Sequence, residues 1–216
     1  GVQTCALPIL VNTHFPPVDA SLDELNRFAT PAQQRLIFEE AFLFQMGVMA
    51  RRRSAASEQK AGAVVVTDQI RETARQVLPF KLTNGQRVAL KEIVDDLQRP
   101  HPMNRLLQGD VGAGKTIVAL LAAVVAMENG LQVAFMAPTE ILANQHFSNI
   151  SRLLSQSRFR VELLTGSTAP LDKHTLRSSI ERGSSHLIVG THALVEEKIK
   201  FHRLGLVVID EQHRFG

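Results

Sequence analysis

Residues 109–116 of this chain read Gly109-Asp110-Val111-Gly112-Ala113-Gly114-Lys115-Thr116. They fit the pattern G-x-x-x-x-G-K-[ST], which forms a phosphate-binding loop when it lies between a strand and a helix. Residues 105–108 before the loop predict a short buried strand, and the run rich in Ala, Val and Leu at 117–127 predicts a helix. This context favours a phosphate loop over the alternative, a flexible glycine turn.

The predicted loop offers the groups that a triphosphate and its metal ion require. Glycines allow successive N–H groups to point at phosphate oxygens, and the start of the helix adds its own free N–H groups. Lys115 would reach the β- and γ-phosphates, and the Thr116 hydroxyl would bind Mg²⁺. The residues expected to contact the nucleotide here are Gly109, Gly112, Ala113, Gly114, Lys115 and Thr116.

A second motif, at 206–213, is an apolar run that ends in two adjacent carboxylates. Residues 206–209 predict a parallel strand buried on both faces, so Asp210 would lie at its carboxyl end, where α/β sheets bind ligands. Asp210 could hold Mg²⁺, directly or through water, and Glu211 could orient and deprotonate the attacking water. A surface Asp-Glu pair is the alternative, disfavoured by the upstream loop. The catalytic candidates are Lys115, Asp210 and Glu211, and the metal ligands are Thr116 and Asp210.

The region after Phe80 alternates between helical stretches and short apolar runs. Such alternation predicts parallel βαβ units, and hence an α/β fold with a parallel sheet flanked by helices. The strands are expected to centre on Leu107, Phe135, Leu163, Ile188 and Val208.

Two helices are expected upstream of this region. Residues 31–53 predict one long helix, with Thr30 as its cap and a broad apolar face. Residues 54–62 are polar and predict a loop, after which Asp68 is a candidate cap for a helix that runs to Leu78.

The composition narrows the class of protein. The chain has 216 residues, of which 44% are hydrophobic and 21% charged, with a net charge of +3. This suits a globular protein and is compatible with a nucleic-acid partner. Cys5 is the only cysteine, which excludes a disulfide within the chain and a cysteine-rich zinc site. No apolar run is long enough to span a bilayer, so we expect no membrane partner and a cytoplasmic location.

Together, the two motifs resemble the RecG family of ATP-dependent DNA helicases, which are superfamily 2 motors. The match consists of residues 109–116 with Asp210-Glu211-Gln212-His213-Arg214-Phe215-Gly216, and the resemblance covers roughly Ser21 to Gly216. It implies a RecA-like lobe, ATP and Mg²⁺ as cofactors, and branched or forked DNA as partner, in fork reversal, Holliday junction processing, recombination and repair. The transcription-repair coupling translocase is the alternative among motors, but it usually carries an acidic residue where Gln212 stands.

The resemblance assigns three further residues to the nucleotide. Phe80 would stack on adenine and Gln86 would read its edge, although Thr83 and Gln86 also fit a helix capping box. The resemblance favours the adenine contact for Gln86. His213 would couple the nucleotide site to the DNA site, and a solvated or core histidine is the alternative.

Three loops that each follow an apolar strand resemble the DNA-contacting motifs of the family. Small residues with hydroxyls and free amides allow close approach to a phosphate, although each loop taken alone also fits an ordinary turn. Thr139 is in addition a plausible helix cap. The residues expected to bind DNA are Pro138, Thr139, Gly166, Ser167, Thr191 and His192.

The resemblance also divides the chain. Residues 1–9 would be a non-native leader, residues 10–79 the end of a wedge domain with a helical linker, and residues 80–216 the first RecA-like lobe, truncated after its acidic motif. The second lobe and the wedge would be missing here. Because the second lobe supplies an arginine finger worth 10³–10⁵ in rate, the chain alone is expected to bind ATP weakly and to hydrolyse little of it. A nucleotide-binding module with no DNA role is the remaining alternative.

Overall fold

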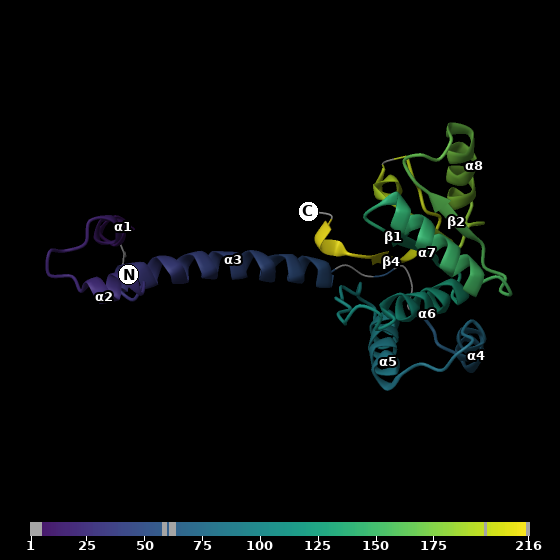
Figure 1. Cartoon of the computed structure of the whole chain (residues 1–216), viewed down its shortest axis with the longest axis horizontal. Coiled ribbons are helices and arrows are strands. Elements are labelled where there is room, and N and C mark those ends of the chain that lie inside the picture. Colours follow the sequence, from purple (N-terminus) through teal and green to yellow (C-terminus); the bar gives the residue numbers. More distant parts are fainter. Residues whose placement is uncertain (1–5, 58–59, 61–63, 197, 215–216) are drawn as a thin grey trace. The chain divides into compact units, whose positions relative to one another are not determined.

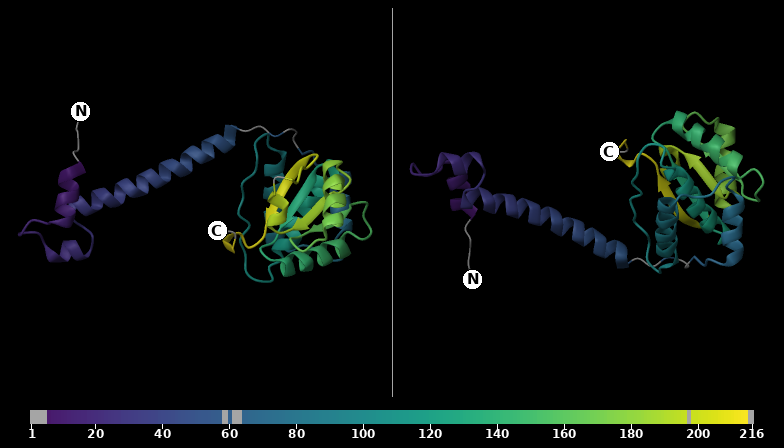
Figure 2. Two further views of the ribbon diagram at one scale, coloured as in Figure 1. Left: turned by 90° about the horizontal axis from the view of Figure 1, so that it is seen from above. Right: turned by 60° about the horizontal axis from the view of Figure 1, so that its bottom comes forward.

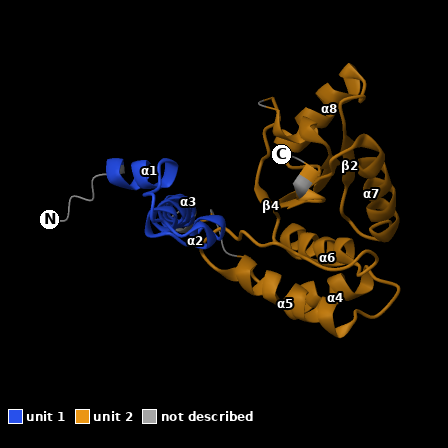
Figure 3. Cartoon of the chain, turned by 60° about the vertical axis from the view of Figure 1, so that its left-hand side comes forward, with its two compact units in different colours: residues 1–59 blue, residues 60–216 orange. Residues whose placement is uncertain are grey.

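The structure is a computed structural model that describes residues 6–57, 60, 64–196 and 198–214. The chain divides into two compact units, Gly1–Gln59 and Lys60–Gly216, which Figure 3 colours separately.

The described residues of the first unit form three helices, α1 (Ala6–His14), α2 (Leu22–Asn26) and α3 (Pro31–Ser57) (Figure 1). The long helix expected from residue 31 is confirmed, and it continues to Ser57. Gln33 N–H donates to the Thr30 hydroxyl at 3.4 Å, which confirms the expected cap. Residues 1–5 of the predicted leader lie outside the described residues, and the rest of it belongs to α1.

The second unit is built on a parallel sheet of four strands (Figure 2). In chain order these strands are β1 (Gln132–Met136), β2 (Val161–Leu164), β3 (Leu187–Gly190) and β4 (Leu204–Ile209), and in space their order is β2-β3-β1-β4. All three pairings are parallel. The expected α/β class is therefore confirmed, as are four of the five expected strands.

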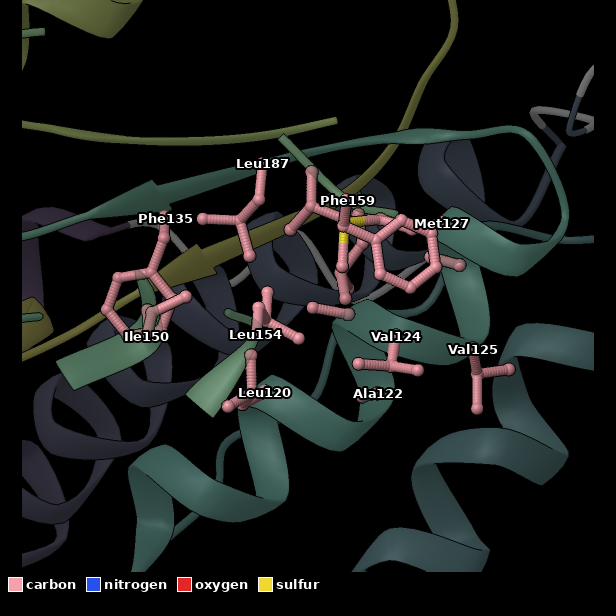
Figure 4. Packing of buried hydrophobic residues seen from close by; sticks show 14 of the residues in the cluster. Leu120, Ala122, Val124, Val125, Met127, Phe135, Ile150, Leu154, Phe159 and Leu187 are labelled. Carbon is pink, nitrogen blue, oxygen red and sulfur yellow. The ribbon is translucent and has the colours of Figure 1, made fainter. Parts of the chain in front are cut away.

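Helices cover both faces of the sheet. Val133 and Phe135 of β1 pack into a core formed with α6 (Lys115–Glu128) and α7 (Glu140–Leu153), part of which Figure 4 shows. The other face of the sheet packs against α8 (Pro170–Glu181) and a short 3-10 helix, η1 (His192–Val195). Because β1 and β3 are buried on both faces, their near-continuous apolar sequences match their position at the centre of the sheet.

An outer layer of two helices, α4 (Asp68–Gln76) and α5 (Asn84–Gln98), packs against α6. The cap of α4 is Thr67 rather than Asp68, because the Thr67 hydroxyl accepts a hydrogen bond from Ile70 N–H at 3.3 Å. The Ile70 side chain is buried in the main core, which places α4 in the second unit. The compact unit thus begins before residue 80, whereas assignment of the upstream residues to a wedge domain stays a prediction.

The strand expected at residues 105–108 was wrong, because this segment forms neither strand nor helix. Leu106 is 74% exposed. The Arg105 guanidinium, just ahead of it, pairs with Glu92 and Asp96 of α5 at 2.6 and 2.7 Å. The segment is therefore held by α5 through side chains, and a short apolar run cannot by its pattern reveal whether a neighbouring strand pairs with it.

The expectation that β4 is buried on both faces was also wrong. Among the described residues, β4 pairs only with β1 and forms an edge of the sheet. Val207 and Ile209 are 47% and 45% exposed, whereas Leu206 is buried. A continuous apolar sequence therefore did not imply double burial in this strand.

Candidate nucleotide site and adjoining loops

The carboxyl ends of all four strands lie at the same edge of the sheet. Met136 is in register with Gly190 and with Ile209, and Leu164 is in register with Gly190. The segments that leave this edge therefore follow one another in the order of the strands. They are residues 165–167 after β2, 191–192 after β3, 137–139 after β1, and 210–211 after β4.

The phosphate loop leads directly into α6. Gly114 is the residue before the helix, and both Gly112 and Gly114 have positive φ, at 83° and 79°, as expected for a tightly curled loop. Lys115 Nζ donates to the carbonyl oxygens of Gly109 at 2.8 Å and Asp110 at 3.0 Å. The lysine thus folds back over its own loop, onto weaker acceptors than a phosphate would offer.

The direction of α6 places this loop toward the carboxyl edge. The helix packs on β1 and β4, and residues 129–131 join its end to the start of β1. Its 14 residues rise about 21 Å, and the five residues of β1 span about 16 Å. A helix that ends beside the start of β1 and runs back along the sheet therefore begins near the end of that strand.

Gln86 joins α5 to the phosphate loop. The capping box with Thr83 is present, since Thr83 N–H donates to Gln86 Oε1 at 2.9 Å and Gln86 N–H donates to the Thr83 hydroxyl at 3.3 Å. Gln86 Nε2 in turn donates to the Ala113 carbonyl at 2.9 Å. The cap is thereby confirmed. Contact with adenine stays a prediction, and it would have to exchange at least one of these bonds.

Phe80 lies in a cavity of about 870 Å³ between α4, α5 and α6. Its side chain is 51% exposed, and Arg87, one residue after Gln86, lines the same cavity. An aromatic ring and a guanidinium can each stack on a planar base, but no phosphate-loop residue lines this cavity. The role expected of Phe80 therefore also stays a prediction.

Asp210 is held at the end of β4 by two contacts. Its N–H donates to the Met136 carbonyl at 2.9 Å, and its Oδ2 lies 2.8 Å from Nε2 of His146 on α7. Glu211 follows with a φ of 51°, which is uncommon for a residue with a side chain and which recurs at functional sites. His146 was not predicted as a site residue, because a lone histidine on a helix carries no signal of its partner. The side chain of His213 lies outside the described part of the chain.

Two of the candidate DNA loops are tied together by Glu140, a second residue that the sequence did not single out. The Glu140 carboxylate accepts hydrogen bonds from Ser167 N–H at 3.0 Å and from its hydroxyl at 2.7 Å. The hydrogen bond from the Ser167 hydroxyl is the main cause that lowers the pKa of Glu140 below its usual value. Both donors of Ser167 are thus used within the chain, and its contact with DNA stays a prediction.

The other candidate DNA residues lie at the same edge. Thr139 caps α7, with its hydroxyl accepting from Leu142 N–H at 3.3 Å, as expected, and Pro138 precedes it. Thr191 precedes η1, whose first residue is the exposed His192. Gly166 is exposed, and a Cβ atom there would lie 3.0 Å from the Glu140 carboxylate.

Comparison with known proteins agrees with this arrangement of a phosphate loop and an acidic strand end on a parallel sheet. Residues 83–216 match the family model for DEAD/DEAH box helicases. The chain therefore belongs to the DEAD/DEAH box helicase family.

Within that family, the relatives are RecG helicases, which confirms the resemblance found in the sequence. The chain is 48% identical over 200 residues to the ATP-dependent DNA helicase RecG of Aquifex aeolicus, an alignment that covers 93% of this chain and 25% of the relative. It is 45% identical over 207 residues to RecG of Synechocystis, covering 96% and 24%. A solved structure of RecG bound to a three-way DNA junction superposes with a TM-score of 0.77 and 43% identity, covering 86% of this chain and 25% of that one.

The chain thus spans about a quarter of the length of these relatives. The parallel sheet flanked by helices is consistent with a RecA-like lobe. In the part of the chain that the structure describes, no helix has both the length and the apolar character needed to cross a membrane.

Proposed function

We propose that this chain carries the nucleotide-binding lobe of an ATP-dependent DNA helicase or translocase that acts on branched DNA. The observation that carries the proposal is the shared carboxyl edge, where Asp210 ends β4, three candidate DNA loops end the neighbouring strands, and α6 begins with the phosphate loop. The relatives named as ATP-dependent DNA helicases support the reaction.

The loop would bind ATP through its backbone N–H groups and Lys115. On binding a γ-phosphate, Lys115 Nζ would exchange the Gly109 and Asp110 carbonyls for phosphate oxygens. The Thr116 hydroxyl and the Asp210 carboxylate are oxygen donors of the kind that Mg²⁺ prefers, so they fit the ion. Bound Mg²⁺ would neutralise charge on the phosphates.

Glu211 would orient the attacking water and accept its proton. Its backbone conformation, with a φ of 51°, is the observation that singles it out. Phe80 and Gln86 would hold the base, and His213 would link the nucleotide to the DNA side. These three assignments rest on the family resemblance.

The proposed DNA contacts depend on the spatial order of the loops along the carboxyl edge of the sheet. The candidate DNA loops follow β1, β2 and β3, which are neighbours in the sheet, as a continuous track requires. Their candidate residues are Pro138 and Thr139 after β1, Gly166 and Ser167 after β2, and Thr191 and His192 after β3. This order favours a motor over a nucleotide-binding module without DNA. A branched substrate is inferred from the RecG relative bound to a three-way junction. The transcription-repair coupling translocase stays the alternative within motors.

We expect the other parts of the motor to lie elsewhere in a longer protein. We infer that residues 10–79 join this lobe to a wedge domain, and that a second RecA-like lobe supplies the arginine finger. The chain alone would then bind ATP weakly and turn it over little, since such a finger is worth 10³–10⁵ in rate. The cytoplasmic location expected from the sequence stays a prediction.

Two assays test the proposal. A fluorescent ATP analogue, titrated into this chain with Mg²⁺, should bind, and Lys115→Ala should abolish that binding. Lys200→Ala is the matched control, because Lys200 is an exposed lysine outside the phosphate loop and does not line the cavity that contains Phe80. In the longer protein, a three-way junction should stimulate ATP hydrolysis more than linear duplex does. Unchanged binding in Lys115→Ala, or hydrolysis indifferent to DNA, would refute the proposal.

A further inference from the structure

We propose that His146 is a positioning residue that holds the carboxylate of Asp210 in the orientation needed for the magnesium nucleotide. The inference rests on the proposed function and adds a residue to it. It also assigns two roles to α7, because this helix begins at a candidate DNA loop and would also hold the candidate metal ligand Asp210.

The contact between the two side chains is short and sheltered. His146 Nε2 lies 2.8 Å from Asp210 Oδ2, and the two side chains are 12% and 28% exposed. An ionised carboxylate only accepts hydrogen bonds, so the imidazole donates through Nε2–H. A hydrogen bond to a charged group is among the stronger kinds, and partial burial reduces the competition from water.

The imidazole ring also packs against a buried aromatic ring. Its centroid lies 4.8 Å from that of Phe135, a residue of β1 that is almost fully buried. This contact restrains the imidazole, so it favours donation to Asp210 from one position. Side chains locked in this way orient metal ligands in proteins, and losing them typically lowers metal affinity 10–100-fold.

Asp210 is positioned through two of its atoms, its backbone nitrogen and Oδ2. The Met136 carbonyl accepts from its backbone N–H at 2.9 Å and His146 contacts Oδ2, which leaves Oδ1 and the second lone pair of Oδ2 for a metal or its water. Without His146, the carboxylate would turn about its side-chain bonds, and Mg²⁺ would have to order it on binding.

The same helix reaches the candidate DNA track. Thr139 caps α7, and Glu140 in its first turn holds Ser167. His146 lies two turns further along this 14-residue helix. The helix that begins at a candidate DNA loop therefore also carries the side chain that holds Asp210.

The test compares three variants of this chain by titrating a fluorescent ATP analogue with Mg²⁺ and with EDTA. His146→Phe keeps a ring against Phe135 but has no N–H, and we expect it to lose about tenfold of the tightening that Mg²⁺ confers. Its affinity in EDTA should not change. His146→Gln places an amide N–H at a similar reach and should retain most of that tightening. His174→Phe, at an exposed position on α8, is the matched control.

A double variant separates positioning from packing. In an Asp210→Asn background, His146→Phe should have little further effect on the Mg²⁺ dependence, because the two residues act through one carboxylate. Imidazole NMR of the nucleotide-free chain should show a protonated Nε2 on His146 whose signal shifts in Asp210→Asn.

The outcomes are distinct. If His146→Phe keeps the Mg²⁺ dependence of the parent chain, or if Nε2 is unprotonated, the inference is overturned while the proposed function stands. If the parent chain binds no magnesium nucleotide, or Lys115→Ala binds it as well as the parent, both are overturned.

Discussion

The centre of the sheet and its β4 side are built differently, although both contribute to the same edge. Phe135 and Val189 in the central strands are fully buried. Thr139 caps the helix that follows β1, and Glu140 of that helix accepts hydrogen bonds from Ser167 in the loop after β2. On the other side, Ile209 is half exposed and residues 105–108 are irregular. The phosphate loop is thus held mainly by α6 and Gln86 rather than by a strand.

This difference indicates where the lobe is rigid and where it can adjust. Loops anchored on strands buried on both faces keep their geometry when ligands come and go. A loop held by one helix start and one side chain can change shape at little cost. The following predictions test this contrast, from the largest expected effect to the smallest.

The first compares a truncation in the core with one at the sheet edge. Phe135→Ala should lower the free energy of unfolding by about 3–5 kcal/mol, because it leaves a cavity in the core around a fully buried ring. Val207→Ala on β4 should cost about 1 kcal/mol or less, since Val207 is half exposed. Urea unfolding followed by far-UV circular dichroism measures both. Equal losses would show that β4 is as buried in solution as the centre.

The second prediction compares how alanine at two glycines of the phosphate loop changes stability. Gly112 and Gly114 both have positive φ, so alanine at either should cost about 1–2 kcal/mol of backbone strain. A Cβ at Gly114 would also collide with the amide of Gln86, whereas a Cβ at Gly112 meets open space. Gly114→Ala should therefore be the more destabilising variant in thermal unfolding.

Removing the collision partner makes this prediction sharper. In a Gln86→Ala background, the excess cost of Gly114→Ala over Gly112→Ala should largely vanish. An excess that persists would mean that Gln86 does not contact the loop.

The third compares two helix caps. Thr139→Ala at the start of α7 and Thr83→Ala at the start of α5 each remove a hydroxyl acceptor and should cost about 1 kcal/mol. The two should differ in function. Thr139→Ala should weaken DNA binding by the longer protein, measured by fluorescence anisotropy, and Thr83→Ala should leave it unchanged. The reverse pattern would contradict the assignment of Thr139.

The fourth prediction concerns the pKa of Glu140, at the carboxyl edge of the sheet. Ser167 lowers the pKa of Glu140, so Ser167→Ala should raise that pKa toward its usual value, as read from carboxyl NMR shifts. Because the folded pKa is the lower one, the stabilisation from this contact is complete above the unfolded pKa. It is lost as the pH falls through the folded value. An unchanged pKa in Ser167→Ala would show that the contact does not form in solution.

Much of the fold could be predicted from local patterns. The runs at 161–164 and 187–189 became strands, and Thr83 and Thr139 became caps, because a short apolar run or an S/T cap acts over a few residues. The segment at 105–108 was predicted wrongly, because a strand needs a partner and Arg105 binds α5 instead.

The candidate site divides in the same way. Lys115 and Asp210 were predicted as site residues from motif spacing, and their roles stay predictions. His146 and Glu140 were not predicted, because their partners lie 64 and 27 residues away along the chain. Such contacts depend on how α7 packs across the sheet, and no local pattern reports that.

The sequence alone was enough to predict the two motifs on which the proposed chemistry depends, since a phosphate loop and an acidic strand end require only the right residue types in consecutive order. Tertiary structure alone decided which strand became an edge, which side chain holds Asp210, and which candidate loops became neighbours. The physical reason is that backbone conformation and capping are set within a few residues, whereas strand pairing, burial and side-chain contacts are settled between segments that meet only when the chain folds.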